Sequence, residues 1–135
     1  MATADRTHVS RQDLPAETMG DYEGRMAELG EYTVSFESLP KGFPPGGADA
    51  FEGLPDDACQ SPHWGYLFKG SFRLRYTDGS EALVRAGEAY YAPPGHQFEA
   101  LEDCETVEFS PTKELQETLA VVGPNVERFF GGVPG

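Results

Sequence analysis

The chain has 135 residues, a length that suits one domain with a single hydrophobic core. Its 23 acidic and 10 basic residues give a net charge of −13, which repels nucleic-acid phosphates and anionic lipid, so neither is expected as a partner. No apolar leader or membrane-length apolar run is present, which predicts a cytoplasmic protein. A disulfide between Cys59 and Cys104 is not expected in that compartment, although it stays open as an alternative.

The first predicted element is a polar N-terminal arm, residues 1–30, in which Met26 and Leu29 share one face of a short helical turn. Residues 32–37 then alternate between large apolar and polar side chains, the two-residue period of a half-buried strand. Residues 40–57 are dense in proline and glycine and are predicted to form a loop with one short turn. An irregular segment of this length in a small domain is usually functional or disordered.

Regular alternation begins at residue 63 and continues through several short strands to residue 111. In the first of these strands one face carries His63, Gly65 and Leu67. The other face carries aromatic residues expected to pack on a sheet or to form a dimer interface: Trp64, Tyr66 and Phe68. Residues 78–79, Asp-Gly, predict a hairpin, because glycine readily adopts the positive φ of a tight turn.

A helix is predicted after the last strand, with Thr112 as its cap and with one apolar stripe. Gly123 and Pro124 are expected to end it. The pattern therefore predicts an N-terminal arm (1–30), a small barrel or sandwich of antiparallel strands (31–111) and a C-terminal helix with a tail (112–135).

Glycine and proline spacing from residue 51 to residue 111 resembles that of the cupin superfamily. "HWGYLFKG", residues 63–70, is similar to the end of the first cupin motif, in which six residues separate a glutamate from a glycine. "GEAYYAPPG", residues 87–95, is similar to the start of the second motif: a glycine, five residues, a proline, one residue and a glycine. The resemblance implies an all-β fold, a small antiparallel jelly-roll β-barrel, to which the pattern adds the arm and the helix.

The chain departs from the cupin motifs at the metal ligands. The family's first motif supplies two histidines and a glutamate, and its second motif supplies one histidine. In this chain His63 stands at the position of the glutamate, and Asp57 and Cys59 stand at those of the two histidines. Phe98 replaces the last histidine, and His96 precedes it by one strand period, so both side chains should point the same way. The candidate metal ligands are Asp57, Cys59, His63 and His96.

A cysteine, two histidines and a carboxylate suit a borderline divalent ion, zinc in the first place, with iron, manganese and nickel as alternatives. Without Asp57 the other three would leave one coordination position for water, as catalytic sites do. Each residue also has an ordinary structural interpretation: a buried thiol for Cys59, a core histidine for His63, a surface residue at the barrel mouth for His96 and a loop acid for Asp57.

Three further residues are candidates for the lining of a pocket inside the barrel: Tyr91, Phe98 and Arg75. An inward arginine among aromatic side chains would bind a carboxylate or phosphate, whereas the alternative is an exposed arginine on the strand. Glu99 and Glu108 could serve as general bases, but the pattern groups them with solvated strand acids.

The favoured function is that of a small cupin-like metal-binding protein, an enzyme acting on a small polar organic molecule inside the barrel. The alternative is a metal-free small-molecule-binding or sensing module, with His63, Tyr91 and Phe98 around an apolar pocket. Whether the chain is an enzyme stays open, because the fold does not select a reaction. A homodimer is expected with either function, since the resemblance to cupins implies pairing.

Overall fold

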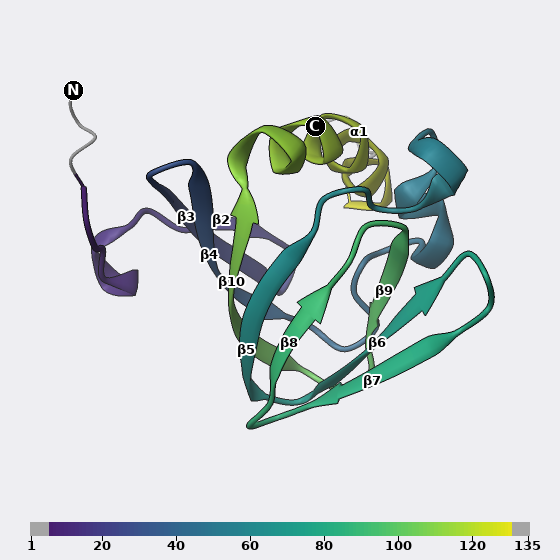
Figure 1. Cartoon of the computed structure of the whole chain (residues 1–135), viewed down its shortest axis with the longest axis horizontal. Helices are drawn as coiled ribbons and strands as arrows, with labels where there is room; N and C mark the ends of the chain where they lie inside the picture. Colours follow the sequence, from purple (N-terminus) through teal and green to yellow (C-terminus); the bar gives the residue numbers. More distant parts are fainter. Residues whose placement is uncertain (1–5, 131–135) are drawn as a thin grey trace.

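Two antiparallel sheets and one long helix make up the computed structural model, which describes residues 6–130 (Figure 1). The larger sheet has the order β2 (Glu17–Met19), β3 (Tyr22–Leu29), β4 (Tyr32–Leu39), β10 (Cys104–Pro111), β5 (His63–Lys69) and β8 (Ala89–Ala92). The smaller sheet has the order β7 (Glu81–Arg85), β6 (Ser71–Tyr76) and β9 (His96–Ala100). Helix α1 (Thr112–Phe130) and three 3-10 turns, η1 (Arg11–Asp13), η2 (Gly47–Phe51) and η3 (Pro55–Asp57), complete the described part.

The predicted all-β jelly roll is confirmed, with one difference in its closure. Over residues 6–130 the two sheets pack as a sandwich and are not hydrogen-bonded into one closed barrel. The main core lies between them and includes Leu67, Phe72, Leu74 and Ala92. Both cysteines are buried free thiols, so no disulfide joins them. None of the helices among the described residues is long and apolar enough to cross a membrane.

The segment predicted as an arm with a helical turn, residues 1–30, is described from residue 6 on and contains strands β2 and β3 of the larger sheet. The predicted turn at Met26 and Leu29 is wrong, because both residues lie in β3 and pair with β4. The extended conformation is favoured by a small apolar cluster, in which Leu14 packs with Ala27 and Val34. The sheet therefore begins before residue 31, where the barrel was predicted to start.

Strand β4 alternates as predicted, but its polar side faces the interior. Val34 is buried beneath the N-terminal segment, on the outer side of the sheet. Ser35 and Glu37 line an interior cavity instead. The usual assignment of polar residues to solvent fails here because both sides of this strand are covered.

Helix α1 covers one end of the sandwich (Figure 1). The predicted end at Gly123 and Pro124 is wrong, although Pro124 lacks the N–H that an uninterrupted helix requires. Tertiary contacts hold the following turn: Val126 is buried with the residues of η2, and Asn125 Nδ2 donates hydrogen bonds to the carbonyl oxygens of Ala50 (3.1 Å) and Glu52 (2.8 Å).

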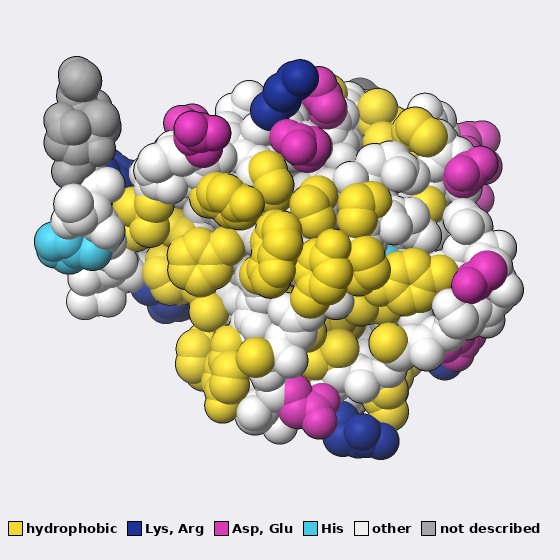
Figure 2. All heavy atoms as spheres, viewed as in Figure 1, with side chains coloured by type: hydrophobic (Ala, Val, Ile, Leu, Met, Phe, Trp, Pro, Cys, Tyr) yellow, Lys and Arg dark blue, Asp and Glu magenta, His cyan; other side chains and the backbone are white. Residues whose placement is uncertain are grey.

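The predicted two faces of β5 are confirmed. His63 and Leu67 are buried, whereas the outer face carries exposed aromatic side chains. Together with neighbours on β4, β8 and β10 they form what we call the aromatic face: Tyr32, Trp64, Tyr66, Phe68, Tyr91 and Phe109. Figure 2 shows the hydrophobic side chains gathered on this side of the molecule.

Candidate functional site

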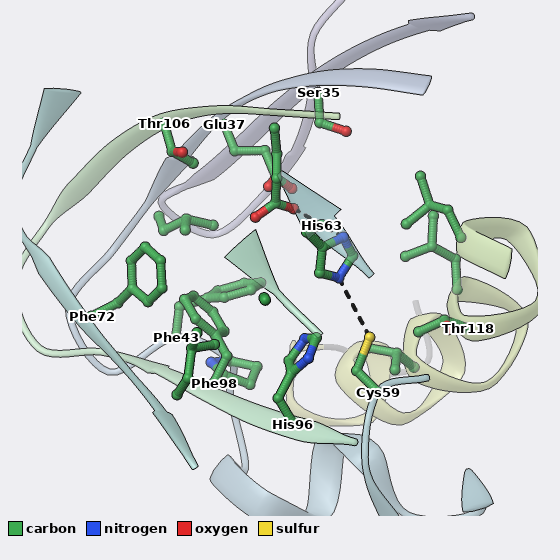
Figure 3. Close-up of a pocket in the computed structure, with 18 of the residues that line it drawn as sticks. Ser35, Glu37, Phe43, Cys59, His63, Phe72, His96, Phe98, Thr106 and Thr118 are labelled. Atoms are coloured by element: carbon green, nitrogen blue, oxygen red, sulfur yellow. Dashed lines mark hydrogen bonds and ion pairs between the residues drawn. The ribbon is translucent and has the colours of Figure 1, made fainter. Parts of the chain in front are cut away.

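An interior cavity of about 150 Å³ lies beneath helix α1 and receives side chains from both sheets (Figure 3). A space of that size holds a molecule about as large as benzene. Its aliphatic and aromatic lining is interrupted by a few polar side chains: Ser35, Glu37, Cys59, His63, Tyr90, His96, Thr106, Glu108 and Thr118. None of the described lining residues is a lysine or an arginine.

Three of the predicted metal ligands meet at one end of this cavity. One side-chain donor atom from each of Cys59, His63 and His96 lies within 4.8 Å of the others. His63 opens β5, His96 opens β9, and Cys59 lies just before β5, where its N–H donates a hydrogen bond to the His96 carbonyl oxygen at 2.7 Å. This backbone bridge between two loop ends fixes the relative position of the thiol and the imidazole.

The spacing of the donor atoms fits zinc. Cys59 Sγ lies 3.5 Å from His63 Nε2, as the dashed line in Figure 3 marks. Tetrahedral zinc, with bonds of about 2.3 Å to sulfur and about 2.1 Å to nitrogen, requires these two atoms about 3.5 Å apart. The His96 ring stands edge-on to the His63 ring, with centroids 5.2 Å apart, so both imidazoles border the same space.

Hydrogen bonds at Nδ1 orient both histidine rings and favour the tautomer in which Nε2 can bind a metal. His96 Nδ1 lies 2.7 Å from the Pro93 carbonyl oxygen, an atom that can only accept, so Nδ1 carries the proton and Nε2 has a free lone pair. His63 Nδ1 lies 2.7 Å from Ser110 Oγ and 3.4 Å from a Glu108 carboxylate oxygen, which favours the same tautomer. Metal-binding histidines in proteins are commonly oriented by such acceptors on the second ring nitrogen.

Burial sets the protonation states of the cluster. Desolvation lowers the pKa of His63 and that of His96 to about 4, so both rings are neutral at physiological pH. Desolvation also raises the pKa of the Cys59 thiol to about 11. The cluster is therefore a neutral thiol beside two neutral imidazoles, and a metal would have to displace only the thiol proton.

Two half-buried carboxylates, Glu37 on β4 and Glu108 on β10, also line the cavity, and Glu108 lies next to His63. Each accepts a hydrogen bond from a tyrosine: Tyr22 donates to Glu37 at 2.8 Å, and Tyr90 donates to Glu108 at 2.7 Å. Burial raises the pKa of each carboxyl group to about 7, and for Glu37 the neighbouring charge of Glu108 acts in the same direction.

Both tyrosines reach their carboxylate across a glycine. Gly24 pairs with Glu37 and Gly65 pairs with Glu108 in the strand register. A Cβ added to Gly24 would clash with the Tyr22 ring, and one added to Gly65 would lie 2.5 Å from the Tyr90 ring. The absence of a side chain at Gly24 therefore leaves room for the Tyr22 ring over β3. In the same way, Gly65 leaves room for the Tyr90 ring over β5.

The other predicted site residues lie away from the metal cluster. Asp57 is exposed, has a φ of 52° and accepts a hydrogen bond from the Gly53 N–H at 3.1 Å, so its carboxylate belongs to the loop. Arg75 is exposed and pairs with Glu81 at 3.0 Å instead of entering the cavity.

The two remaining pocket candidates differ from each other. Tyr91 lies on the aromatic face, where it stacks on Trp64 with ring centroids 5.1 Å apart. Phe98 lines the cavity. Of the two candidate bases, Glu99 is exposed and accepts a hydrogen bond from Arg73, whereas Glu108 is inside the cavity, contrary to its grouping with solvated acids.

Sequence reasoning missed Glu37 and Tyr22 as site residues, and it placed Tyr90 only among several strand residues that could line the cavity. The strand pattern alone placed Glu37 on a polar face and gave no partner to either tyrosine. The one usable signal was the pair of glycines in strand-like segments, Gly24 and Gly65, because an isolated glycine in a strand often marks a close approach of another group.

Comparisons with known proteins agree with this architecture. No protein-family model matches the chain, and no curated protein matches it. Among solved structures, an RmlC-like cupin from Shewanella frigidimarina has a TM-score of 0.55 and 16% identity, over 79% of this chain and 92% of its own. Oxalate decarboxylase from Bacillus subtilis has a TM-score of 0.54 and 19% identity, over 82% of this chain but only 30% of its own.

The chain therefore has the cupin fold, a jelly roll with a polar cluster at one end of its interior. This chain spans about a third of the oxalate decarboxylase chain that it resembles. At these identities the similarity establishes the fold, and the chemistry has to be argued from the side chains described above.

Proposed function

We propose that this chain is a metal-dependent cupin-fold enzyme, which binds zinc or a similar divalent ion through Cys59, His63 and His96 and acts on a small polar organic molecule in the cavity. The observation that carries the proposal is the convergence of three donor atoms within 4.8 Å at the wall of an interior cavity. Bound there, the ion would supply Lewis-acid polarisation of a ligand oxygen.

The residues around the cluster have distinct tasks. Ser110 and the Pro93 carbonyl hold the two imidazoles in the tautomer that leaves Nε2 free. Helix α1 contributes Leu115, Thr118 and Val122 to the cavity lining. Glu37, whose pKa lies near 7, is suited to give or take a proton from the bound molecule.

The same side chains also resemble a nucleophilic triad, in which Cys59 would attack, His63 would accept its proton and Glu108 would orient the ring. The protonation states argue against this mechanism. A catalytic cysteine requires a lowered thiol pKa, whereas burial raises that of Cys59 to about 11. A metal ion removes this difficulty, because coordination stabilises the thiolate.

Elemental analysis of untagged protein tests the proposal. About one equivalent of zinc, iron, manganese or nickel per chain is expected in the wild type, and His63→Ala and Cys59→Ser should lose it. Matched controls are His8→Ala, an exposed histidine, and Cys104→Ser, a buried cysteine outside the cavity lining, which should keep the metal.

Cobalt substitution adds a spectroscopic test. A thiolate-to-cobalt absorption band is expected in the wild type and should disappear in Cys59→Ser. Absence of metal from all preparations, with no cobalt uptake, would instead favour a metal-free binding or sensing module.

A further inference from the structure

Five aromatic rings form a continuous arc beside the cavity. Adjacent ring centroids lie 5.0 Å apart for Tyr22 and Phe43, 6.4 Å for Phe43 and Phe98, 5.3 Å for Phe98 and Phe72, and 5.0 Å for Phe72 and Tyr90. All but Tyr22 line the cavity directly. Figure 3 shows Phe43, Phe72 and Phe98 together on one side of the space.

The arc begins and ends at the two carboxylates. Tyr22, at one end, donates its hydroxyl to Glu37, and Tyr90, at the other end, donates to Glu108. Register brings the two acids near each other, since Glu37 pairs with Thr106 and Glu108 pairs with Ser35 across the same two strands. Aromatic rings and carboxylates thus surround one region of the cavity.

This region has no cation of its own. Among the described residues, neither Glu37 nor Glu108 forms an ion pair with a lysine or an arginine. Both carboxylates line the cavity, and a carboxylate taken partly out of water is costly without a counter-charge. The net charge of −13 adds a long-range field that attracts cations.

A second polar group also lacks a partner. His96 is only 3% exposed, and none of the hydrogen bonds among the described residues involves its Nε2, because its bond to Pro93 uses Nδ1. The His63 ring lies between Glu108 and Cys59. Its Nδ1 is 3.4 Å from a Glu108 carboxylate oxygen, and its Nε2 is 3.5 Å from Cys59 Sγ. A short carbon chain is therefore enough to connect a group at the carboxylates with a group at the histidines.

We propose that the cavity binds a small organic ammonium ion that carries an oxygen a short chain away from its nitrogen. The ammonium group lies between Glu37 and Glu108, its alkyl substituents lie against the rings of the arc, and its oxygen faces Cys59, His63 and His96. Aromatic faces attract organic ammonium ions through their quadrupole, and the carboxylates supply the counter-charge. This inference deepens the proposed function and rests on it, since the oxygen would face the metal.

Calorimetric titration with three probes that share a head of three methyl groups but differ in charge tests the charge preference. The probes are choline, its neutral carbon isostere with a tert-butyl group in place of trimethylammonium, and pivalate as the anion. Choline should bind at least about 10-fold more tightly than the isostere, a difference of about 1.4 kcal/mol, and pivalate should not bind. Equal binding of choline and the isostere, or no binding of choline, would overturn the proposal.

Variants locate the site. Glu37→Gln should weaken choline binding by about 10-fold or more and leave binding of the isostere within about 2-fold. The matched control is Glu105→Gln, an exposed position on β10 with the same change in net charge, which should alter neither. If Glu37→Gln fails to fold by circular dichroism, Phe98→Leu replaces it, with the same expectation for choline. A folded variant of either kind with wild-type choline affinity would refute the placement.

Parallel assays on metal-loaded and chelated protein separate the two proposals. Choline binding to chelated protein that never takes up metal would support the ammonium site and refute the metal-dependent function. Stoichiometric metal with no choline binding would refute the ammonium site and leave the metal function standing.

Discussion

Replacing the half-buried carboxylate Glu37 by glutamine should change how the stability of the protein depends on pH. Glu37 has a pKa of about 7 in the folded state, against an ordinary value of 4.5. Its protonated form is therefore favoured by folding, and the stability that it contributes is complete below pH 4.5 and is lost as pH rises through about 7. Glutamine keeps an oxygen for the Tyr22 hydroxyl but does not titrate.

The size of the effect follows from these two pKa values. Between about pH 5.5 and about pH 8, the wild type should lose about 2 kcal/mol of unfolding free energy through Glu37, and the variant should lose none of it. The difference between Glu37→Gln and the wild type should therefore move by about 2 kcal/mol in favour of the variant over that range.

Urea unfolding of chelated protein measures this difference. The lower pH is kept above the isoelectric point of about 4.4, where the protein would be least soluble. Glu105→Gln is the matched control and should follow the wild type at every pH. A Glu37→Gln curve that stays parallel to the wild type would mean that the Glu37 carboxyl titrates as it does in water, and the argument from its burial would be wrong.

Three further predictions concern the packing, the metal and the association of the chain. Gly65→Ala should destabilise the fold by about 1–3 kcal/mol in urea unfolding, because the added Cβ overlaps the Tyr90 ring; an unchanged midpoint would contradict this. Apparent zinc affinity should rise about 10-fold per pH unit between about pH 6 and pH 9, because only Cys59 has a proton to lose when the metal binds. Chelator competition, corrected for the chelator's own protons, measures this affinity, and an affinity independent of pH would exclude a thiolate ligand. The predicted homodimer, if it forms through the aromatic face, should become monomeric by light scattering in Trp64→Ser combined with Tyr91→Ser, whereas a monomeric wild type would contradict the prediction.

The strand pattern predicted antiparallel strands in a small barrel or sandwich, and the resemblance to the cupin motifs supplied the jelly roll and the ligand positions of Cys59 and His63. Two-residue alternation set the inward face of β5, and the same period placed His96 with Phe98 after a Pro-Pro-Gly turn. Spacing failed for Asp57, since a left-handed backbone conformation directs its carboxylate to the Gly53 N–H. The number of residues between motif positions does not predict the backbone conformation at Asp57, and this conformation decides where its carboxylate points.

The carboxylates that line the cavity could not be predicted in the same way. Alternation in β4 identifies two faces, but which face is interior depends on the N-terminal segment, which covers Val34 and leaves Glu37 inside. The partnership of Tyr22 with Glu37 depends in turn on the register of β3 with β4. Such contacts arise only when segments distant from the local pattern come together.

The anchoring of helix α1 has a consequence for how this cavity can change. Leu115, Thr118 and Val122 form part of its wall, while Asn125 and Val126, which hold the turn after Pro124 to the segment around η2, lie outside the lining. Because Pro124 lacks the N–H of a regular helix, these contacts stabilise the last turns. The part of the helix that lines the cavity therefore precedes Pro124 and the part that anchors it follows, so the anchor can be substituted without changing a lining residue.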